Sequence, residues 1–552
     1  MRTVEGVVLD AEQGQPLVGS TIRLKGTAQG TTTDEQGRFA LTVPRDCPPL
    51  EVSYLGFETQ EVVPGPSGRV LIHMKPRASE LEEIIVTAVG IAANKRNLAY
   101  AIDNLKVSAV APTNEPNLVN ALTAQVAGLW VNSASGSPGA SAGIFIRGQR
   151  SVNGSNKPLF VLDGMPLDNS TFGNSSQGVD VSNRLIDLNP HDIESISILK
   201  GAAATALYGI RAANGAIVLS SRKGEPGRPR VRFYSAYGLA RPNKLPPRQT
   251  TYAQGKYVDG EARYMGPETS VSSSYGPPLR ALEFDGDPTY PYDPNGRLVP
   301  KGQGNGLPAR RYDPYATFFV TGQSTDNFLS ISGGSRWVDY YLSYGHFFEK
   351  GIEPRSTFRR HSLKSGFTLR PAEALTLHLH SNLLASGGYR LKRGSMFSGV
   401  PLGLFRNPNT FDIGNGKSGY AAANDPATYT LPDGKQRSYR GNGRYDNPFW
   451  SVNHNPFEDE VQRLVQSLKA DYRLAPWLGL SLGAGFDSYR DDRRDAFDIH
   501  SGTHRDGQVN FWDIRSRHFN SDLLLSAEWK THPDWMLKAT LGHNYFASVF
   551  RV

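Results

Sequence analysis

The chain has 552 residues, of which 38% are hydrophobic, and its 57 Gly, 37 Pro, 24 Tyr and 25 Phe favour short strands and turns over a helical protein. No apolar stretch approaches the roughly 18–20 residues of a spanning helix, which excludes a helical membrane protein. The formal charge of +8 arises from 60 basic and 52 acidic residues without a basic block, so nucleic acid is not an expected partner. A single cysteine excludes a disulfide framework.

Residues 1–76 alternate short β-prone runs with turn signals. The runs 4–10, 20–26, 38–43, 50–54 and 70–74 predict a small antiparallel β-sandwich. The phrases "GQPLVGSTIRLKGT", "GTTTDEQGRFALTVP" and "LEVSYLGFET" resemble the carboxypeptidase-regulatory-like domain. Such domains imply no chemistry, and Asp34 and Glu35 are interpreted as turn formers rather than metal ligands.

Residues 77–97 are predicted to be a linker that contains a short, β-prone run. Such a run can add as an extra strand to an exposed sheet edge, or it can be an ordinary strand of the next domain. The surrounding "LEEIIVTAVGI" resembles the TonB box of TonB-dependent transporters of the SusC/RagA family. The resemblance implies that the periplasmic coupling protein TonB grips the segment Glu83, Ile84, Ile85, Val86 and Thr87.

Residues 98–227 are predicted to form an α+β domain. Apolar residues at helical spacing predict a helix over 117–126 that stops at Gly128, and small residues predict another over 201–208. Strands are expected at 143–147, 158–163, 193–199 and 216–221, with a turn at Asn189–Pro190 and a hairpin signal at Asn214–Gly215.

The glycine-rich loops of this domain fit no phosphate-binding motif, and Arg147 and Asp163 are interpreted as loop or turn residues rather than catalytic ones. The phrases "QVAGLWV", "IFIRGQRS", "PLFVLDGMPLDN", "LNPHDIESISILKGAAATALYG" and "ANGAIVLSSRKG" resemble the SusC/RagA plug. The resemblance implies a structural plug motif of Arg147, Gly148, Asp163, Gly164, Asn214 and Gly215. A plug blocks free diffusion, so opening the pore requires work delivered from outside.

Residues 228–552 show longer runs with a period of two. Leucines at 375, 377, 379 and 383, and apolar residues at 478–486, interleave with small or polar residues. A soluble sandwich also alternates, but run lengths of roughly nine to fourteen residues favour a membrane barrel. Long polar loops are expected at about 241–325, 391–457 and 490–512.

Several side chains of these runs and loops are candidates for binding a metal ion or another ligand. His378 and His380 share a strand face without a third ligand, and the acidic loop residues do not have EF-hand spacing, so no metal site is predicted. Loop aromatic residues can stack on sugars or contact a lid protein. These acidic and aromatic residues are Asp285, Asp287, Asp293, Tyr290, Tyr292, Tyr312, Trp450 and Trp512.

The predicted architecture is mainly β: a β-sandwich extension, an α+β plug and a partial antiparallel transmembrane β-barrel. About nine to eleven strands are expected in 228–552, whereas plugged transporters close with 22 strands. Residues 1–5 run directly into a strand without an apolar leader segment. We therefore expect a piece of a longer transporter, a split gene or a remnant that does not transport.

The resemblance implies import across the outer membrane, powered by TonB, with a SusD-like lipoprotein over the mouth and an oligosaccharide or oligopeptide as cargo. No cofactor is expected. The alternatives are a truncated remnant and a β-rich binding or adhesion protein of soluble domains. An enzyme is not expected, because no nucleophile–base set, zinc spacing or phosphate loop is found.

Overall fold

A computed structural model describes residues 2–552 except 12–13, 28, 45–47, 55–56, 66–67, 76–83, 87–91, 95–101, 108–116, 134, 153–154, 172–177, 202–203, 206–207, 395 and 533–534. The chain divides into two compact units, Met1–Ile85 with Ala92–Ala99, and Val86–Ile91 with Tyr100–Val552. Within the described residues, no helix has both the length and the apolar character needed to cross a membrane.

The N-terminal unit contains two small sheets. Its strands are β1 (Arg2–Asp10), β2 (Thr21–Leu24), β3 (Gly30–Thr32), β4 (Arg38–Val43), β5 (Leu50–Ser53), β6 (Gln60–Val62) and β7 (Arg69–Met74). One sheet has the order β4-β1-β7 and the other β3-β2-β5-β6. Alternate residues such as Val4, Val8, Ile22 and Val52 are buried between them. The expected antiparallel sandwich is wrong in one pairing, because β1 and β7 run parallel.

The predicted coupling segment is described only in its middle. Strand β8 (Ile84–Val86) pairs with β9 (Ala92–Asn94) in a two-stranded sheet. Glu83 and Thr87 lie outside the described residues.

The predicted plug is built on a five-stranded sheet of order β10-β15-β16-β13-β14 and a separate pair, β11-β12. Its strands are β10 (Ile102–Lys106), β11 (Leu129–Ser133), β12 (Ala142–Ile146), β13 (Leu159–Leu162), β14 (Met165–Leu167), β15 (Ile193–Leu199) and β16 (Ala216–Ser221). The helix expected over 117–126 is shorter: α2 is Leu118–Ala121, capped by the Asn117 side chain. The chain leaves the helical conformation at Ala124, whose φ is 61°, so Leu122 and Val126 reach the core from turns.

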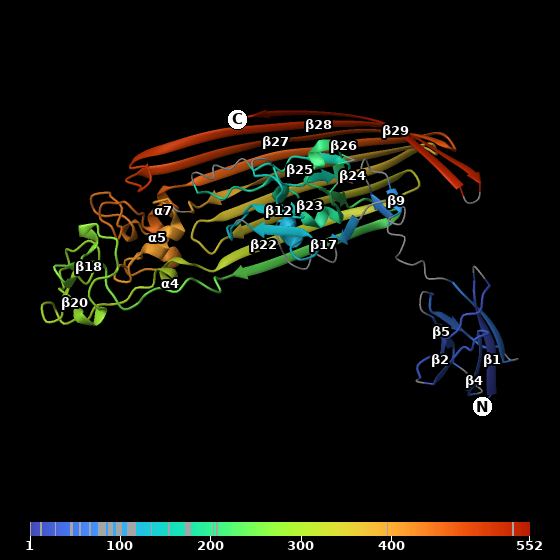
Figure 1. Cartoon of the computed structure of the whole chain (residues 1–552), viewed down its shortest axis with the longest axis horizontal. Coiled ribbons are helices and arrows are strands. Elements are labelled where there is room, and N and C mark those ends of the chain that lie inside the picture. Colours follow the sequence, from blue (N-terminus) through green and yellow to red (C-terminus); the bar gives the residue numbers. More distant parts are fainter. Residues whose placement is uncertain are drawn as a thin grey trace. The chain divides into compact units, whose positions relative to one another are not determined.

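A nine-stranded antiparallel sheet curves around one side of the plug (Figure 1). Its strands, in sheet order, are β17 (Gly227–Ala240), β22 (Gly322–Gly334), β23 (Val338–Lys350), β24 (Thr357–Ala372), β25 (Leu375–Arg390), β26 (Phe457–Ala475), β27 (Leu478–Ile499), β28 (Asp506–His532) and β29 (Trp535–Arg551). Short turns join the strands at one end, and the long connections 241–321 and 391–456 leave from the other. This arrangement is typical of the periplasmic and extracellular ends of an outer-membrane barrel.

The loop expected at 490–512 is wrong, because β27 continues to Ile499 and β28 begins at Asp506. Inward and outward residues still alternate in this segment, but the inward residues are charged: Asp491, Arg493 and Asp495 are buried. Strands β26 to β28 are therefore longer than expected, at 19, 22 and 27 residues. Outward-facing residues nearer the short turns are apolar and exposed, for example Leu482 and Leu523.

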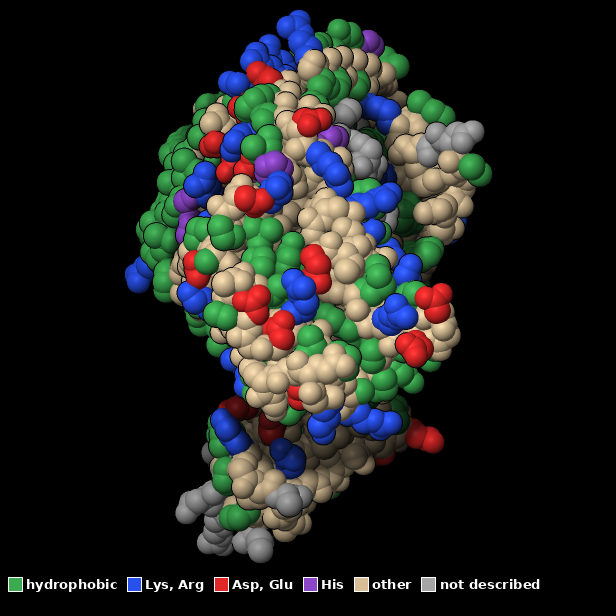
Figure 2. Space-filling view, turned by 90° about the vertical axis from the view of Figure 1, so that its left-hand side faces the viewer, with side chains coloured by type: hydrophobic (Ala, Val, Ile, Leu, Met, Phe, Trp, Pro, Cys, Tyr) green, Lys and Arg blue, Asp and Glu red, His purple; other side chains and the backbone are tan. Residues whose placement is uncertain are grey.

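The long connections form a folded loop region rather than extended chain. It contains β18 (Gly255–Val258), β19 (Glu261–Tyr264), β20 (Leu282–Phe284), β21 (Leu298–Pro300), α4 (Pro314–Phe318), α5 (Val400–Arg406), α6 (Gly419–Ala423) and α7 (Pro448–His454), with 3-10 turns η8 (Pro267–Thr269), η9 (Leu279–Ala281) and η10 (Pro426–Thr428). Phe318, Phe449 and Trp450 belong to its own hydrophobic core. On the face toward this region, basic, acidic and hydrophobic side chains are interspersed, so the described surface there shows no single basic patch (Figure 2).

Candidate functional site: the plug against the sheet wall

One plug segment, residues 182–192, lies against the inner face of the sheet. It folds into two short 3-10 turns, η5 (Arg184–Asp187) and η6 (Pro190–Asp192). Leu185 and Leu188 are buried in the plug core, which anchors the segment to the rest of the plug. Asn189 accepts a hydrogen bond from the His191 N–H and donates its own amide to Ser362 on β24, at 2.9 Å. The segment therefore joins the plug core to the sheet.

Two buried arginines of the sheet hold plug carbonyls while each is paired to an aspartate of the next strand. Arg390 binds Asp459 with two hydrogen bonds of 2.8 and 3.2 Å, and it also donates to the carbonyls of Pro138 and Gly139, at 2.7 and 2.9 Å. It also donates to the Ser182 hydroxyl. A bidentate carboxylate fixes the guanidinium plane, so the other donors are aimed at the plug.

Arg463 repeats this arrangement one strand further along the sheet. It binds Asp487 through two hydrogen bonds of 2.8 and 2.7 Å. Its other donors reach the carbonyl oxygens of Arg184 and Asp168, at 2.6 and 3.1 Å. The side chains of Arg463 and Asp487 are fully buried.

Strand β24 supplies two further cations to the same plug segment. Arg360 donates to the carbonyls of Ile186 and Leu188, at 2.9 and 3.2 Å. Lys364 reaches the carbonyls of Asp192 and Arg222, at 3.4 and 3.2 Å. The Asp192 carbonyl also accepts from the Arg222 N–H, at 2.8 Å. The sheet cations therefore add donors to plug carbonyls that lie outside the strand ladders.

Acidic and aromatic side chains of the plug also contact the sheet. Asp192 accepts hydrogen bonds from Tyr341 and Ser343 on β23. His191 Nε2 lies 3.0 Å from the Asp326 carboxylate on β22, and its ring stacks on Phe328 with centroids 5.0 Å apart. Arg184 also lies 3.7 Å from Asp491 on β27, so the contacts of residues 182–192 extend over strands β22 to β27.

Inward-facing glycines make room for the plug at two places. A Cβ added at Gly345 would lie 2.0 Å from the Asn189 amide nitrogen, and one at Gly485 would lie 2.4 Å from the Met165 sulfur. Strand β14, which contains Met165, contacts β27 and β28. A side chain at either position would clash with the Asn189 or Met165 side chain as it now lies.

The predicted plug-motif residues Asp163 and Gly164 lie in the two-residue turn between β13 and β14. Both have positive φ, 49° and 88°, as a type I′ hairpin requires. The Asp163 carboxylate accepts hydrogen bonds from the Ser221 N–H, at 2.9 Å, and hydroxyl. Burial alone would raise the pKa of this carboxyl, but neighbouring His380 and Lys364 and the Ser221 bonds hold it below its ordinary value.

The remaining plug-motif residues lie in other turns. Arg147 and Gly148 follow β12 with positive φ values of 58° and 86°. Asn214 donates to the Ser155 carbonyl, and Gly215 has a φ of 93°. The expected hairpin at Asn214–Gly215 is wrong, because the pair follows the 3-10 turn η7 (Gly209–Ala212) and a long connection separates β15 from β16.

Most loop aromatics expected to be free for sugars are occupied inside the loop region. Trp450 is 2% exposed, stacks on His454 and donates to Ser501. Tyr290 and Tyr312 donate to Glu268 and Asp293, at 2.7 and 2.8 Å. Tyr292 is half-buried beside the loop-region core. Trp512 was predicted to lie in a loop, and this is wrong: it lies on β28, half-buried beside a cluster of sheet residues. These contacts favour a structural role for the aromatic residues.

The acidic loop residues act as turn formers, in agreement with their interpretation from sequence. Asp285 accepts from the backbone N–H groups of Asp287 and Arg297, and Asp293 accepts from that of Asn295. His378 and His380 lie on the inner face of β25, and His378 contacts Thr368. Within the described part of the chain, no group of three metal-binding side chains is found.

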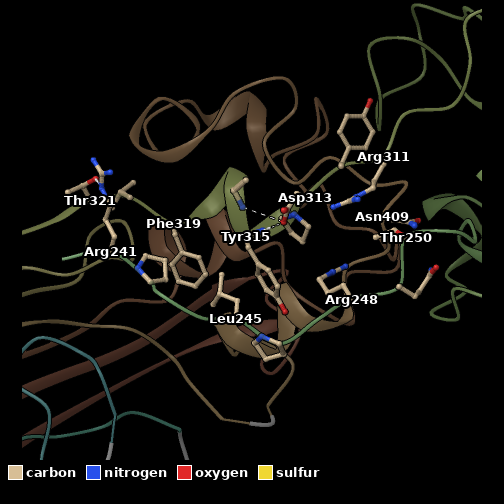
Figure 3. A pocket seen from close by; sticks show the side chains of 17 residues that line it. Arg241, Leu245, Arg248, Thr250, Arg311, Asp313, Tyr315, Phe319, Thr321 and Asn409 are labelled. Carbon is tan, nitrogen blue, oxygen red and sulfur yellow. Dashed lines mark hydrogen bonds between the residues drawn. The ribbon is translucent and has the colours of Figure 1, made fainter.

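The loop region contains a pocket of about 650 Å³ between the segment after β17 and helix α4 (Figure 3). Arg241, Arg248, Arg311, Tyr315 and Phe319 contribute to its lining. Arg248 donates to carbonyls at the end of α5, and the Asp313 side chain caps α4, so these two groups have structural roles. The pocket combines guanidinium groups with aromatic rings.

Two family models match the chain: a CarboxypepD_reg-like domain at residues 4–86 and a TonB-dependent receptor plug domain at residues 94–216. The chain is 27% identical to the TonB-dependent receptor SusC of Bacteroides thetaiotaomicron over 473 residues, 85% of this chain and 41% of SusC. The chain therefore contains a TonB-dependent receptor plug domain and is similar to receptors of the SusC/RagA type. It is also 27% identical to the TonB-dependent receptor P3 of Formosa agariphila, over 88% of this chain and 42% of that receptor.

Solved structures share the fold of this chain. The RagAB peptide importer in its open-open state matches with a TM-score of 0.63 and 20% identity, over 85% of this chain and 50% of that one. Its closed-closed state matches with a TM-score of 0.60 and 21% identity, over 82% and 49%. The chain therefore spans about two fifths of its curated relatives and half of these structures. These curated relatives are TonB-dependent receptors.

Sequence reasoning missed the sheet cations that hold the plug. Arg360 and Lys364 on β24, Arg390 on β25 and Arg463 on β26 all occupy inward positions of alternating strands. In an alternating strand, residues two positions apart share a face. A Lys or Arg on the face predicted to point inward is therefore a signal for such a contact. The plug carbonyls as their partners could not be read from the sequence, because the contacts join residues far apart along the chain.

Proposed function

We propose that this chain is part of a TonB-coupled importer of the outer membrane, in which the plug occludes a barrel until TonB pulls on residues 83–87. The observation that most supports this is the attachment of residues 182–192 to the inner face of the sheet by buried cations such as Arg463. A plug held by many charge-assisted hydrogen bonds stays in place without force. Moving it requires work, which the coupling protein supplies.

The coupling segment suits the addition of a further strand. Strand β8 (Ile84–Val86) belongs to a two-stranded sheet, so one of its edges faces no other described strand. An added strand gains main-chain hydrogen bonds along such an edge. Strand β10 follows along the chain at the edge of the plug sheet, paired with β15. We propose that force reaches β10 first and residues 182–192 last.

The partner at the outer mouth is proposed to be a SusD-like lipoprotein lid, and the cargo an oligosaccharide or an oligopeptide. The RagAB assembly, which shares this fold, is described as a peptide importer. The pocket of Figure 3 is the proposed contact for cargo in the loop region, because Arg241 and Arg311 can bind anionic groups and Phe319 can stack on a flat surface. The proposed location is the outer membrane.

The test measures binding of the purified C-terminal domain of TonB to the full chain in detergent. Ile85→Pro removes a main-chain donor from β8, and we expect at least tenfold weaker binding, because proline cannot complete a strand ladder. Ile85→Val keeps the donor and the β-propensity, and binding should stay within about twofold of wild type. Equal binding by the proline variant would refute residues 83–87 as the coupling segment.

A further inference from the structure

The outward face of the nine-stranded sheet changes character along its strands. On β27 the outward residues Leu478, Leu480, Leu482 and Phe486 are followed by Ser488 and Arg490. On β28 the outward residues Leu525, Leu523 and Phe519 are followed by Arg517 and Arg515. The apolar stretch nearer the short turns has the length expected for a lipid-facing band. The arginines begin where that band ends, toward the long-loop end.

Strand pairing places these arginines side by side. Phe486 pairs with Phe519 in the last apolar row, Ser488 with Arg517 in the next, and Arg490 with Arg515 in the one after. Because neighbouring strands lie about 4.8 Å apart, the three guanidinium groups form one compact cluster. We call Arg490, Arg515 and Arg517 the arginine cluster.

Fixed acids neutralise only part of the arginine cluster. Asp513 lies 3.2 Å from Arg490 and 2.7 Å from Arg515, and Asp492 lies 3.0 Å from Arg490. Arg490 and Arg515 nevertheless remain 52% and 50% exposed. No ion pair of the exposed Arg517 is found among the residues that the structure describes. The cluster therefore has donors for an external anion.

An apolar surface adjoins the arginine cluster. Leu363 on β24 pairs with Leu383 on β25, which pairs with Leu464 on β26. Leu363 and Leu383 face outward and are about half exposed. These leucines and the three arginines line one groove of about 650 Å³. A ligand that fits it needs both an anionic group and an apolar chain.

We propose that this groove binds a phosphate-bearing lipid of the outer leaflet, with the phosphate on the arginine cluster and an acyl chain along the leucines. The position supports a lipid over a soluble anion, because the cluster lies at the end of the apolar band, where a headgroup would be. The inference rests on the membrane location in the proposed function. It does not depend on coupling or on cargo.

The test uses the full chain in detergent, with lipid A carrying two phosphates as the probe and its dephosphorylated form as the comparison. Each arginine near a charged lipid surface contributes about fivefold in affinity, so the triple variant Arg490→Gln, Arg515→Gln, Arg517→Gln should bind at least tenfold more weakly. Arg280→Gln, Lys301→Gln, Arg310→Gln removes three exposed loop cations and should stay within about twofold. The single variant Arg517→Gln should lose several-fold while keeping both Asp513 ion pairs.

Native mass spectrometry of bound lipid separates the outcomes. Wild type should retain the phosphorylated lipid preferentially, and the triple variant should lose that preference. Equal retention of both lipids by wild type, or unchanged preference in the triple variant, would overturn the lipid site and leave the importer proposal intact. A chain that stays soluble and monodisperse without detergent would instead overturn the membrane location itself.

Discussion

Replacing Arg463 with methionine tests how the plug is held. The change removes two hydrogen bonds to plug carbonyls and the bidentate partner of the buried Asp487 carboxylate. Breaking a buried ion pair from one side costs about 3–5 kcal/mol, because the remaining charge is left without compensation. We expect this cost to appear as easier detachment of residues 182–192 from the sheet.

Hydrogen–deuterium exchange of the backbone amides of residues 182–192 measures that detachment. A loss of 3–5 kcal/mol corresponds to exchange faster by roughly a hundredfold to a few thousandfold. Arg473→Gln is the matched control, since Arg473 lies on the same strand, is exposed and contacts the sheet turn at Glu373 rather than the plug. Adding Asp487→Asn to Arg463→Met should recover part of the loss, because it removes the unpaired charge. Unchanged exchange in Arg463→Met, or no recovery in the double variant, would contradict the proposed role of this ion pair.

Three further predictions concern the plug contact and the loop region. Gly485→Val should lower the stability measured by thermal unfolding by about 1–3 kcal/mol, since its Cβ would meet Met165 on β14. Gly479→Val on the same strand is the control and should have little effect, because no atom lies nearer than 4.0 Å to the added Cβ. Gly345→Ala should speed hydrogen exchange around Asn189, whose amide would meet the new methyl group; an unchanged rate would contradict the close fit. Burial raises the pKa of Asp446 in the loop region to about 6, from an ordinary value of 3.8, so its protonation stabilises the fold. This contribution to stability is complete below about pH 4 and is lost as pH rises through 6. We expect the free energy of unfolding of the loop region to fall by up to about 3 kcal/mol between pH 4 and pH 7. In Asp446→Asn this free energy should not change over the same range.

The strands of the sheet could be predicted where their outward residues are apolar. Leucines at 375–383 and 478–486 alternate with polar residues, and these runs became parts of β25 and β27. The continuation of β27 through Arg490 and Asp495 was predicted as a loop, because both faces carry charges there. Its inward charges are buried by residues from other parts of the chain, such as Lys392, which follows β25 and pairs with Asp495, and hydropathy does not report such pairing.

The plug was recognisable from its motifs, but its attachment was not. The turn residues Asp163 and Gly164 are adjacent, so a hairpin turn can be read from the sequence. Arg390 and Gly139 are 251 residues apart, and only the fold brings them within hydrogen-bonding distance. The loop aromatic residues were misjudged because the polar composition of the loops hides a folded core: Trp450 stacks on His454 of the same helix and donates to Ser501.

The plug lies against the inner face of this sheet, and a cysteine pair tests that position most directly. A Cβ at position 485 would lie 3.2 Å from the Cβ of Met165, close to the separation of about 3.8 Å in a disulfide. In the full chain with Cys47→Ser, mild oxidation in outer membranes should link Met165→Cys to Gly485→Cys, leaving no thiol for maleimide labelling. Complete labelling of both cysteines under native conditions would contradict the plug position.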